Sequence, residues 1–339
     1  MATVSLPSST RSLRTQAIIG LLLANLCWGL SFPLIKALIL LQERLLPATS
    51  PWFVTAMVLA PRFLFATALL AIWMVVRGEG LMIRRGEWIQ GIVIGLFASA
   101  GMILQSDALQ FTEASTSAFL TQFYAILIPV YLAWRTRVSP GAAVWWSVIL
   151  VLVGVAILGR FDVWKFSLGR GEWETLLCSL FFMGQILWLA KAEFASNRPG
   201  HLTLVMFGTE SLILSAMVGW TMPDLGAVGT LLGSGHWMVF TGGLTVICTI
   251  GAYVLMNTWQ PKITSTEAGL LYCVEPIFGA ILALFLPALF SVWAGISYLN
   301  ETATWTLLVG GGLITAANVW VQLNPPPLKS AAATDRKLL

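Results

Sequence analysis

Charged residues are scarce in this chain. They make up 10% of its 339 residues, whereas hydrophobic residues make up 58%. A soluble domain carries about 25% charged residues, which keep its surface in contact with water. A soluble protein of this length would therefore leave much apolar surface in water. The composition excludes that class and predicts a protein whose main solvent is lipid.

Cysteine and histidine are also rare. The two histidines, His201 and His236, lie far apart in the sequence, and no Cys/His cluster is present. We therefore expect no metal site. All four cysteines fall within apolar stretches, so we interpret them as packing residues and not as a disulfide framework. They are Cys27, Cys178, Cys248 and Cys273.

Several enzyme motifs are missing as well. No G-x-x-x-x-G-K-[ST] sequence occurs, so we do not expect ATP to bind through a P-loop. Neither G-x-S-x-G nor H-E-x-x-H occurs, which removes two common signatures of hydrolases. We therefore expect no cofactor and no enzymatic activity.

Long hydrophobic runs, by contrast, are abundant. A helix needs about 20 mostly apolar residues to cross the hydrocarbon core of a bilayer. The alternating ten-residue strands of an outer-membrane barrel are absent. We therefore predict an all-α integral membrane protein with ten transmembrane helices. The ten runs cover about residues 17–39, 53–76, 88–108, 115–134, 142–159, 174–191, 202–220, 237–257, 266–288 and 304–322.

The distribution of positive charge predicts the orientation in the membrane. Lysine and arginine are kept mainly on the cytoplasmic side. With the N-terminus inside, thirteen of the nineteen lysines and arginines fall in inner segments and four in outer loops. Lys36 and Arg62 fall within spans, where each either contacts a charged group or extends toward the headgroups. We expect an inner or plasma membrane protein with both termini in the cytoplasm. The net charge of +4 then reflects topology and not nucleic-acid binding.

The runs divide the chain into two halves of five spans each. We expect a cytoplasmic tail (1–16), a first five-helix repeat (17–159), a charged periplasmic linker (160–173), a second five-helix repeat (174–322) and a cytoplasmic tail (323–339). An odd number of spans in each half gives the two halves opposite orientations. Inverted repeats of this kind are common in transporters, with the site at the midplane.

A shift of 151 residues aligns the two halves weakly. It places residues 116–129 over residues 267–280, with few identities. Polar side chains of the first segment share one helical face that includes Tyr124, and the matching face includes Tyr272 and Glu275. An in-plane two-fold relation would bring these faces close together.

Glu275 is followed by Pro276 inside a long apolar run. A carboxylate at bilayer depth is costly unless it is paired, hydrated or protonated. Pro276 has no N–H, so the carbonyl of Tyr272 would lose its helical partner. Such a polar notch is tolerated at this depth only where it faces protein or a water-filled cavity. We therefore expect this part of the span to face a central cavity.

Four segments follow one another in a recognisable order. They are CWGLSFPLIK (27–36), PRFLFATALL (61–70), LQFTEASTSAFLTQFYAILIPV (109–130) and VEPIFGAIL (274–282). Together they resemble segments of the drug/metabolite transporter superfamily, specifically its ten-span EamA-type permeases. The resemblance extends over about residues 18–321. It implies a ten-helix, inverted-repeat fold that moves small metabolites, often by export. It also implies a cavity lined mainly by spans one, three, four, six, eight and nine.

The chain departs from the pattern of that family at three places. Ala125 stands where a proline usually follows the span-four tyrosine, and Asp107 stands where a neutral residue is usual. The segment before the last span, residues 286–301, is long. These differences bear on the expected specificity and not on the expected fold.

Polar and aromatic side chains in the middle of several spans form the candidate site. We expect them to bind substrate, with hydrogen bonding between helices as the alternative for each. Glu275 would bind a substrate amine or couple protons, with a structural carboxylate as the alternative. Glu210 would couple protons or organise a local hydrogen-bond network. The expected substrate-binding residues are Glu275, Tyr124, Tyr272, Trp28, Asn25, Gln122, Gln185, Tyr253 and Asn257, and the expected proton-coupling residues are Glu275 and Glu210.

We therefore expect a secondary active transporter, either an exporter or an exchanger, of small metabolites such as amino acids, amines or aromatic compounds. It would work by alternating access around a midplane cavity, with protons as a candidate coupling ion. The alternatives are an intramembrane enzyme that acts on lipid and a non-transporting membrane sensor. The expected partners are a small-molecule substrate and the lipid bilayer, a homodimer is a candidate assembly, and no nucleic acid is expected.

Overall fold

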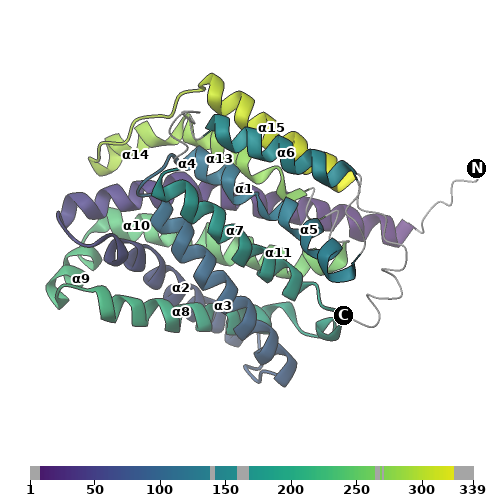
Figure 1. The fold of residues 1–339 in the computed structure, drawn as a ribbon. Coiled ribbons are helices and arrows are strands. Elements are labelled where there is room, and N and C mark those ends of the chain that lie inside the picture. The colour runs from purple at the N-terminus through teal and green to yellow at the C-terminus, as the bar shows by residue number, and fades with distance from the viewer. Residues whose placement is uncertain (1–7, 138–141, 159–167, 264–267, 269–270, 324–339) are drawn as a thin grey trace, which may run out of the picture.

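Every regular element in the described part of the chain is a helix (Figure 1). The computed structural model describes residues 8–137, 142–158, 168–263, 268 and 271–323. The α-helices are α1 (Ser8–Leu45), α2 (Pro51–Val76), α3 (Arg85–Ala108), α4 (Ala114–Thr121), α5 (Tyr124–Thr136), α6 (Ala142–Leu158), α7 (Arg170–Leu189), α8 (Pro199–Thr221), α9 (Leu225–Leu232), α10 (Gly235–Gly243), α11 (Ala252–Trp259), α13 (Glu275–Ala283), α14 (Leu286–Ala294) and α15 (Trp305–Leu323). The 3-10 helices η1 (Ala192–Phe194) and η3 (Gln260–Lys262) and the π-helix η2 (Leu244–Gly251) complete the described elements.

The helices are suited to a membrane. In the described residues six spans are long and apolar enough to cross a bilayer, and the pair α13 and α14, bent by 52°, would make a seventh. The outer faces of the helices carry large apolar side chains such as Ile72, Leu212 and Leu308, which are 59%, 74% and 64% exposed. Backbone groups in lipid must be satisfied within the protein, which a helix achieves. The chain is therefore a multi-pass membrane protein.

Some boundaries differ from those predicted. The first helix begins at Ser8, so part of the predicted tail 1–16 is helical, because intrahelical hydrogen bonds do not stop at the membrane surface. Helix α7 begins at Arg170, inside the predicted linker 160–173. Most of that linker and nearly all of the predicted tail 323–339 lie outside the described residues.

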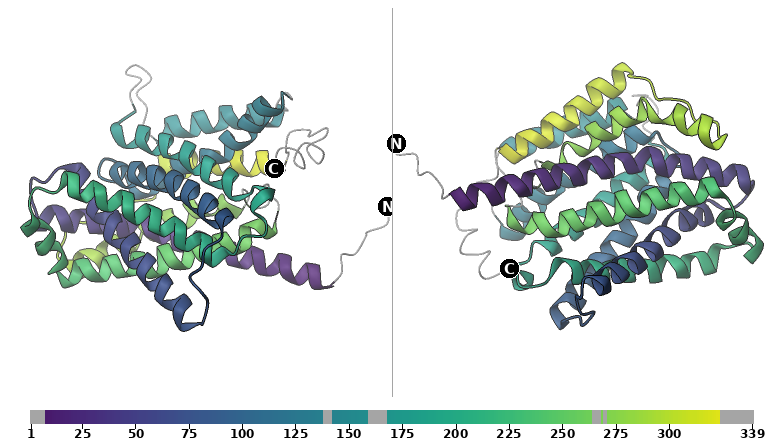
Figure 2. Two further views of the ribbon diagram at one scale, coloured as in Figure 1. Left: turned by 90° about the horizontal axis from the view of Figure 1, so that it is seen from below. Right: turned by 180° about the vertical axis from the view of Figure 1, so that it is seen from behind.

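The long helices lie side by side in a bundle (Figures 1 and 2). Helix α1 runs through its middle, with α6 and α15 toward one edge and α8 toward the other. Glycines allow close approach at both edges. A Cβ on Gly95 of α3 would lie 2.9 Å from the carbonyl oxygen of Met206 in α8. A Cβ on Gly154 of α6 would lie 2.8 Å from the carbonyl oxygen of Gly310 in α15. Small residues thus bring the backbones together, as in other membrane bundles.

Two spans are interrupted inside the bundle. Helix α4 ends at Thr121 and α5 begins at Tyr124, while a turn at residues 273–274 precedes α13, which begins at Glu275. The expected notch in a continuous span is therefore a break between two helices. Pro276 lies in the first turn of α13, where its missing N–H would have no intrahelical partner in any case.

The break between α4 and α5 is stabilised from the other half of the chain. The hydroxyl of Ser179 in α7 donates to the carbonyl oxygens of Leu120, at 3.3 Å, and of Thr121, at 3.0 Å. These are carbonyls at the end of α4, which a regular continuing helix would have used. A buried serine of the second half therefore fixes a helix end of the first half.

Candidate functional site

A central cavity lies between helices of both halves. The empty space between its lining residues is about 560 Å³, part of which is open to the surroundings. Helices α1 to α5 contribute walls from the first half, and α7, α11 and α13 contribute walls from the second. Six of the nine residues predicted to bind substrate line it, namely Trp28, Tyr124, Gln185, Tyr253, Tyr272 and Glu275.

Glu275 is the acidic residue of this cavity. Its side chain is 7% exposed, and its Oε2 accepts a hydrogen bond of 3.2 Å from Nε2 of Gln122. Gln122 itself is fully buried and does not line the cavity, so it supports the carboxylate from behind. Close packing of α1 on α13 sets the position, because a Cβ on Gly29 would lie 2.7 Å from Cβ of Phe278.

Aromatic rings form much of the remaining wall. The ring of Trp28 lies 5.5 Å from that of Tyr253 and 6.0 Å from that of Tyr272, both in edge-to-face geometry. The hydroxyl of Tyr272 donates to Oε1 of Gln260 at 2.6 Å, which fixes the ring. Aromatic faces attract cations, and edge-to-face pairs are stable and rigid. The cavity thus combines a carboxylate with ordered aromatic rings.

Three other predicted site residues lie away from the cavity lining. Asn25 donates from Nδ2 to the carbonyl oxygen of Leu21 at 2.6 Å, within its own helix. Asn257 donates from Nδ2 to the hydroxyl of Thr203 at 2.8 Å, which joins α11 to α8. Glu210, in α8, is fully buried, and neither of its carboxylate oxygens has a hydrogen-bond partner. All three side chains are buried, but the sequence pattern does not say which neighbouring helix they meet.

Arg62 is a cavity residue that sequence reasoning did not assign to the site. It is 1% exposed, so the interpretation that it extends toward the headgroups is wrong. Its Nε donates to the hydroxyl of Thr249, and its Nη2 donates to the carbonyl oxygen of Cys248 at 3.3 Å. The sequence feature that could have indicated a site residue is an arginine two turns inside an apolar run. The direction in which the Arg62 side chain points depends on acceptors in the segment from α10 to α11. The sequence of α2 does not contain that information.

Other missed lining residues are shorter or more ordinary. Gln105 of α3 donates from Nε2 to the hydroxyl of Thr121 at 3.0 Å, and both line the cavity beside the α4 break. Gln105 lies outside the four quoted segments, whereas Thr121 lies within residues 109–130, on the polar face that includes Tyr124. The remaining lining residues outside the prediction are Ser31, Met102, Phe182, Ile186 and Met256.

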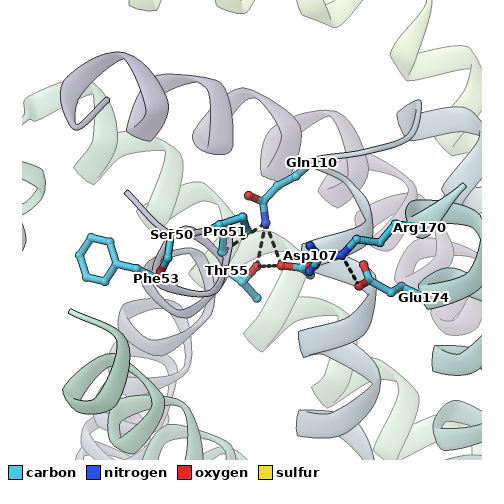
Figure 3. Close-up of polar contacts among 8 residues, drawn as sticks. All are labelled: Ser50, Pro51, Phe53, Thr55, Asp107, Gln110, Arg170 and Glu174. Carbon is cyan, nitrogen blue, oxygen red and sulfur yellow. Dashed lines mark hydrogen bonds and ion pairs between the residues drawn. The ribbon is translucent and has the colours of Figure 1, made fainter. Parts of the chain in front are cut away.

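One end of the bundle is tied by a polar cluster, the Asp107 network, shown in Figure 3. It consists of Asp107, Thr55, Gln110, Arg170 and Glu174. The fully buried carboxylate of Asp107 accepts from the hydroxyl of Thr55 at 3.0 Å, from Nε2 of Gln110 at 3.1 Å and from Nη2 of Arg170. Arg170 also donates from Nε to Glu174 at 2.7 Å. The network joins α2 and α3 of the first half to the start of α7.

Two further side chains form hydrogen bonds at the same end of the bundle as the Asp107 network. Nζ of Lys36 donates to the carbonyl oxygens of Leu109, at 2.5 Å, and of Thr112, at 2.9 Å, so this lysine is held by the protein. The carboxylate of Glu301 accepts from the backbone N–H groups of Ala114, at 2.9 Å, and of Ser115, at 3.3 Å. Burial raises the pKa of Glu301 above its ordinary value, and the nearby Glu113 carboxylate acts in the same direction.

With this geometry in place, comparison with known proteins is informative. Residues 15–160 match the model of a family described as "EamA-like transporter family". The match covers less than half of the 339 residues, and this part of the chain is similar to EamA-like transporters. The match falls on the first half, α1 to α6, and agrees with the resemblance to the drug/metabolite transporter superfamily. The EamA-like family is one of transporters, which is consistent with a protein that is not an enzyme.

Two individual proteins are similar to this EamA-like chain. One is an "Uncharacterized transporter" of Archaeoglobus fulgidus, 25% identical over 192 residues, which are 54% of this chain and 52% of the relative. The match therefore spans about half the length of that relative. The other is a solved structure described as "Crystal structure of protein", with a TM-score of 0.55 and 18% identity. It covers 96% of this chain and all of that chain, so nearly the whole fold is shared.

Proposed function

We propose that this EamA-like protein is a secondary active transporter, an exporter or exchanger, of small metabolites such as amino acids, amines or aromatic compounds. The observation that carries the proposal is the central cavity, to which both halves contribute and in which Glu275 lies beside aromatic rings. Small-molecule sites are mostly apolar, with a few polar groups that fix orientation. A buried carboxylate among aromatic faces suits a substrate with an amine. Glu275, Tyr124, Tyr272, Trp28, Gln185 and Tyr253 would contact it directly, and Gln122, Asn25 and Asn257 would support the helices around it.

The proposal includes ten spans in two inverted repeats, an architecture suited to alternating access. Helices α5 and α13 both begin after a break, at Tyr124 and Glu275, the two positions that a shift of 151 residues superimposes. The packing between helices has the same symmetry: when each helix is replaced by its counterpart in the other half, the corresponding pair of helices is also in contact. Packing of α3 on α7 corresponds to packing of α11 on α1, and packing of α1 on α13 corresponds to packing of α7 on α4 and α5. The pairs α2 with α8, α6 with α15 and α4 with α13 correspond to themselves. We infer two repeats, residues 17–159 and 174–322, joined by the linker 160–173.

The orientation and the coupling ion belong to the same proposal. Positive charge places both terminal segments in the cytoplasm, and the Asp107 network and Glu301 then close the outer end. Glu275 lines the cavity and would exchange a proton for a substrate amine. Glu210 is buried without hydrogen bonds to its carboxylate, which supports it as a second proton-coupling group. Intramembrane acids of this kind are usual markers of proton or substrate pathways.

A ligand screen with Glu275→Gln tests the proposal. The purified full-length protein in detergent would be heated with a panel of amino acids, amines and aromatic compounds. A ligand present at about 100 times its Kd stabilises the native state by about 2.7 kcal/mol. We expect wild type to be stabilised by at least one amine-bearing compound and Glu275→Gln to lose that shift. Glu193→Gln, a change of a half-exposed carboxylate far from the cavity, is the matched control and should keep it.

Transport of the compound found in the screen would then be followed in proteoliposomes. We expect uptake or exchange by wild type, with a dependence on the pH gradient that Glu275→Gln lacks. A panel in which no compound shifts wild type, or a variant that transports with the same pH dependence as wild type, would contradict the proposal.

A further inference from the structure

Arg62 is a charged group of the central cavity whose hydrogen-bonding capacity is incompletely used. Two of its three guanidinium nitrogens donate, to the Thr249 hydroxyl and to the Cys248 carbonyl. The third, Nη1, is buried and has no hydrogen-bond partner. Among the described residues Arg62 also forms no ion pair with a carboxylate. A buried arginine normally uses its donors on an anion or on carbonyl oxygens.

The guanidinium is held in place by an unusual piece of backbone. Its two partners belong to the π-helix η2, whose wider turn changes the normal hydrogen-bond pattern. The hydroxyl of Thr249 donates to the carbonyl oxygen of Leu244, five residues earlier, at 2.9 Å, so its oxygen is oriented to accept from Arg62. The hydroxyl of Thr245 in turn lies 3.4 Å from the carbonyl oxygen of Arg62. Single π-helical turns within α-helices occur frequently at functional sites.

The acids around the cavity do not satisfy this arginine. Glu275 accepts from Gln122, and the structure gives no contact between its carboxylate and Arg62. Glu210 is close enough to interact electrostatically, yet neither of its oxygens accepts a hydrogen bond. The cavity therefore presents a guanidinium group on α2 and a carboxyl group on α13, both held by neutral protein groups, with aromatic rings in the same wall.

We propose that Arg62 is the anion-binding group of the central cavity, so that the substrate carries an acidic group as well as an amine. The guanidinium would bind the acidic group through Nη1, and Glu275 would bind the amine. The substrate class is then a zwitterionic metabolite. This inference rests on the proposed transport function and narrows it, because an amine alone would leave Nη1 unsatisfied.

Matched ligands separate the two charges. Binding to the purified full-length protein would be measured by calorimetry for L-phenylalanine, for 2-phenylethylamine, which lacks the carboxylate, and for 3-phenylpropionate, which lacks the amine. A parallel set would use L-leucine, 3-methylbutylamine and 4-methylpentanoate. In at least one set we expect the zwitterion to bind wild type at least ~10-fold more tightly than either relative, the smallest effect expected for one charged hydrogen bond.

Two variants assign each charge to its residue. Arg62→Gln should abolish the preference for the zwitterion over the amine, and Arg62→Lys, which keeps the charge, should retain part of it. Glu275→Gln should abolish the preference for the zwitterion over the acid. These ratios are informative because a variant that is merely damaged would weaken all three ligands together.

The outcomes distinguish this inference from the proposed function. If the amine binds wild type as tightly as the zwitterion, or if Arg62→Gln keeps the preference, the assignment of Arg62 is wrong while an amine transporter remains. If neither set binds but another compound of the ligand panel does, the zwitterion class is wrong and transport remains. If no compound of the panel binds, both proposals fail.

Discussion

The buried carboxylate of Asp107 is held by several partners at once. Thr55 of α2, Gln110 of the turn after α3 and Arg170 of α7 all donate to this carboxylate, which has no exposed surface. Arg170 gains further contact from aromatic rings, because its Cζ lies 4.4 Å from the ring centroid of Phe111 and 5.4 Å from that of Trp52. A buried carboxylate with one donor would be costly, and convergent donors remove that cost. Asp107, a residue that is unusual for the EamA-like pattern, thus has a structural role.

Asp107→Asn should destabilise the protein measurably. The amide oxygen can still accept from Thr55 and Gln110, but the amide NH2 group then takes the place of Oδ2 and cannot accept from Arg170. We expect a loss of about 1–2 kcal/mol in unfolding free energy, seen as a lower thermal midpoint in detergent. Glu193→Gln is the control, because the Lys191–Glu193 pair is largely exposed and contributes about 0–1 kcal/mol. Equal midpoints for wild type and Asp107→Asn would contradict this role.

At the scale of elements, helix α4 depends on a distant residue for its N-terminus. Its own N-cap residue, Glu113, makes no capping hydrogen bond. Glu301, from the segment between α14 and α15, instead accepts from the first two N–H groups of α4. A carboxylate at a helix N-terminus is favoured by the hydrogen bonds and by the helix dipole. One structural role of the long segment before α15 is therefore to cap a helix of the other half.

The Glu301 cap should give stability a particular pH dependence. Its pKa is raised in the folded protein mainly by burial, so the folded state holds the proton more tightly than the unfolded state. The proton's contribution to stability is then complete below the unfolded pKa and is lost as the pH rises through the folded pKa. We expect the thermal midpoint of wild type to include this fall above about pH 4. Glu301→Gln, which keeps an oxygen acceptor, should lack it.

The matched control is Glu43→Gln, an exposed acid of α1, which should keep the wild-type slope. Glu301→Ala, which removes the cap altogether, should cost about 1 kcal/mol below about pH 4, where the contribution of the protonated side chain is complete. A Glu301→Gln profile parallel to that of wild type would show that the carboxyl does not titrate as argued.

At the scale of the whole molecule, the two halves are joined by several hydrogen bonds at the end tied by Asp107. The hydroxyl of Thr112, between α3 and α4, donates to Oε1 of Glu172 in α7 at 2.8 Å. Nη1 of Arg44 donates to the carbonyl oxygens of Ala294, at 2.9 Å, and Gly295, at 2.5 Å. Alternating access requires such contacts to break at one end while those at the other end form.

A cross-link across this end should stop transport and spare binding. In a background without the four native cysteines, Thr112→Cys with Glu172→Cys would be joined by a short thiol-reactive reagent. We expect the cross-linked protein to bind the ligand found in the screen and to transport none, because the outer end cannot open. The single variants treated in the same way should transport normally. Undiminished transport by the cross-linked pair would show that this end does not move.

The sequence sufficed for much of the architecture. Scarce charge and long apolar runs determine that lipid is the solvent, and lipid allows only helices or closed barrels to span it. The carboxylate at residue 275 could be predicted to face a cavity for the same reason. Six of the nine predicted binding residues line the cavity, since polar and aromatic side chains inside spans have few other places to lie.

Only the tertiary structure decided which of those side chains line the cavity and which form hydrogen bonds with neighbouring helices. Asn25, Gln122 and Asn257 carry the same kind of group as Gln185, yet their amides donate to neighbouring helix or side-chain atoms while Gln185 lines the cavity. The sequence left two directions open for the Arg62 side chain, toward the headgroups or into the protein. The hydrogen-bond acceptors in η2 decide for the second. Local periodicity determines which face of a helix is polar, because it follows from 3.6 residues per turn. Which partner meets that face depends on packing between segments far apart in the chain, and no single segment of the sequence contains that information.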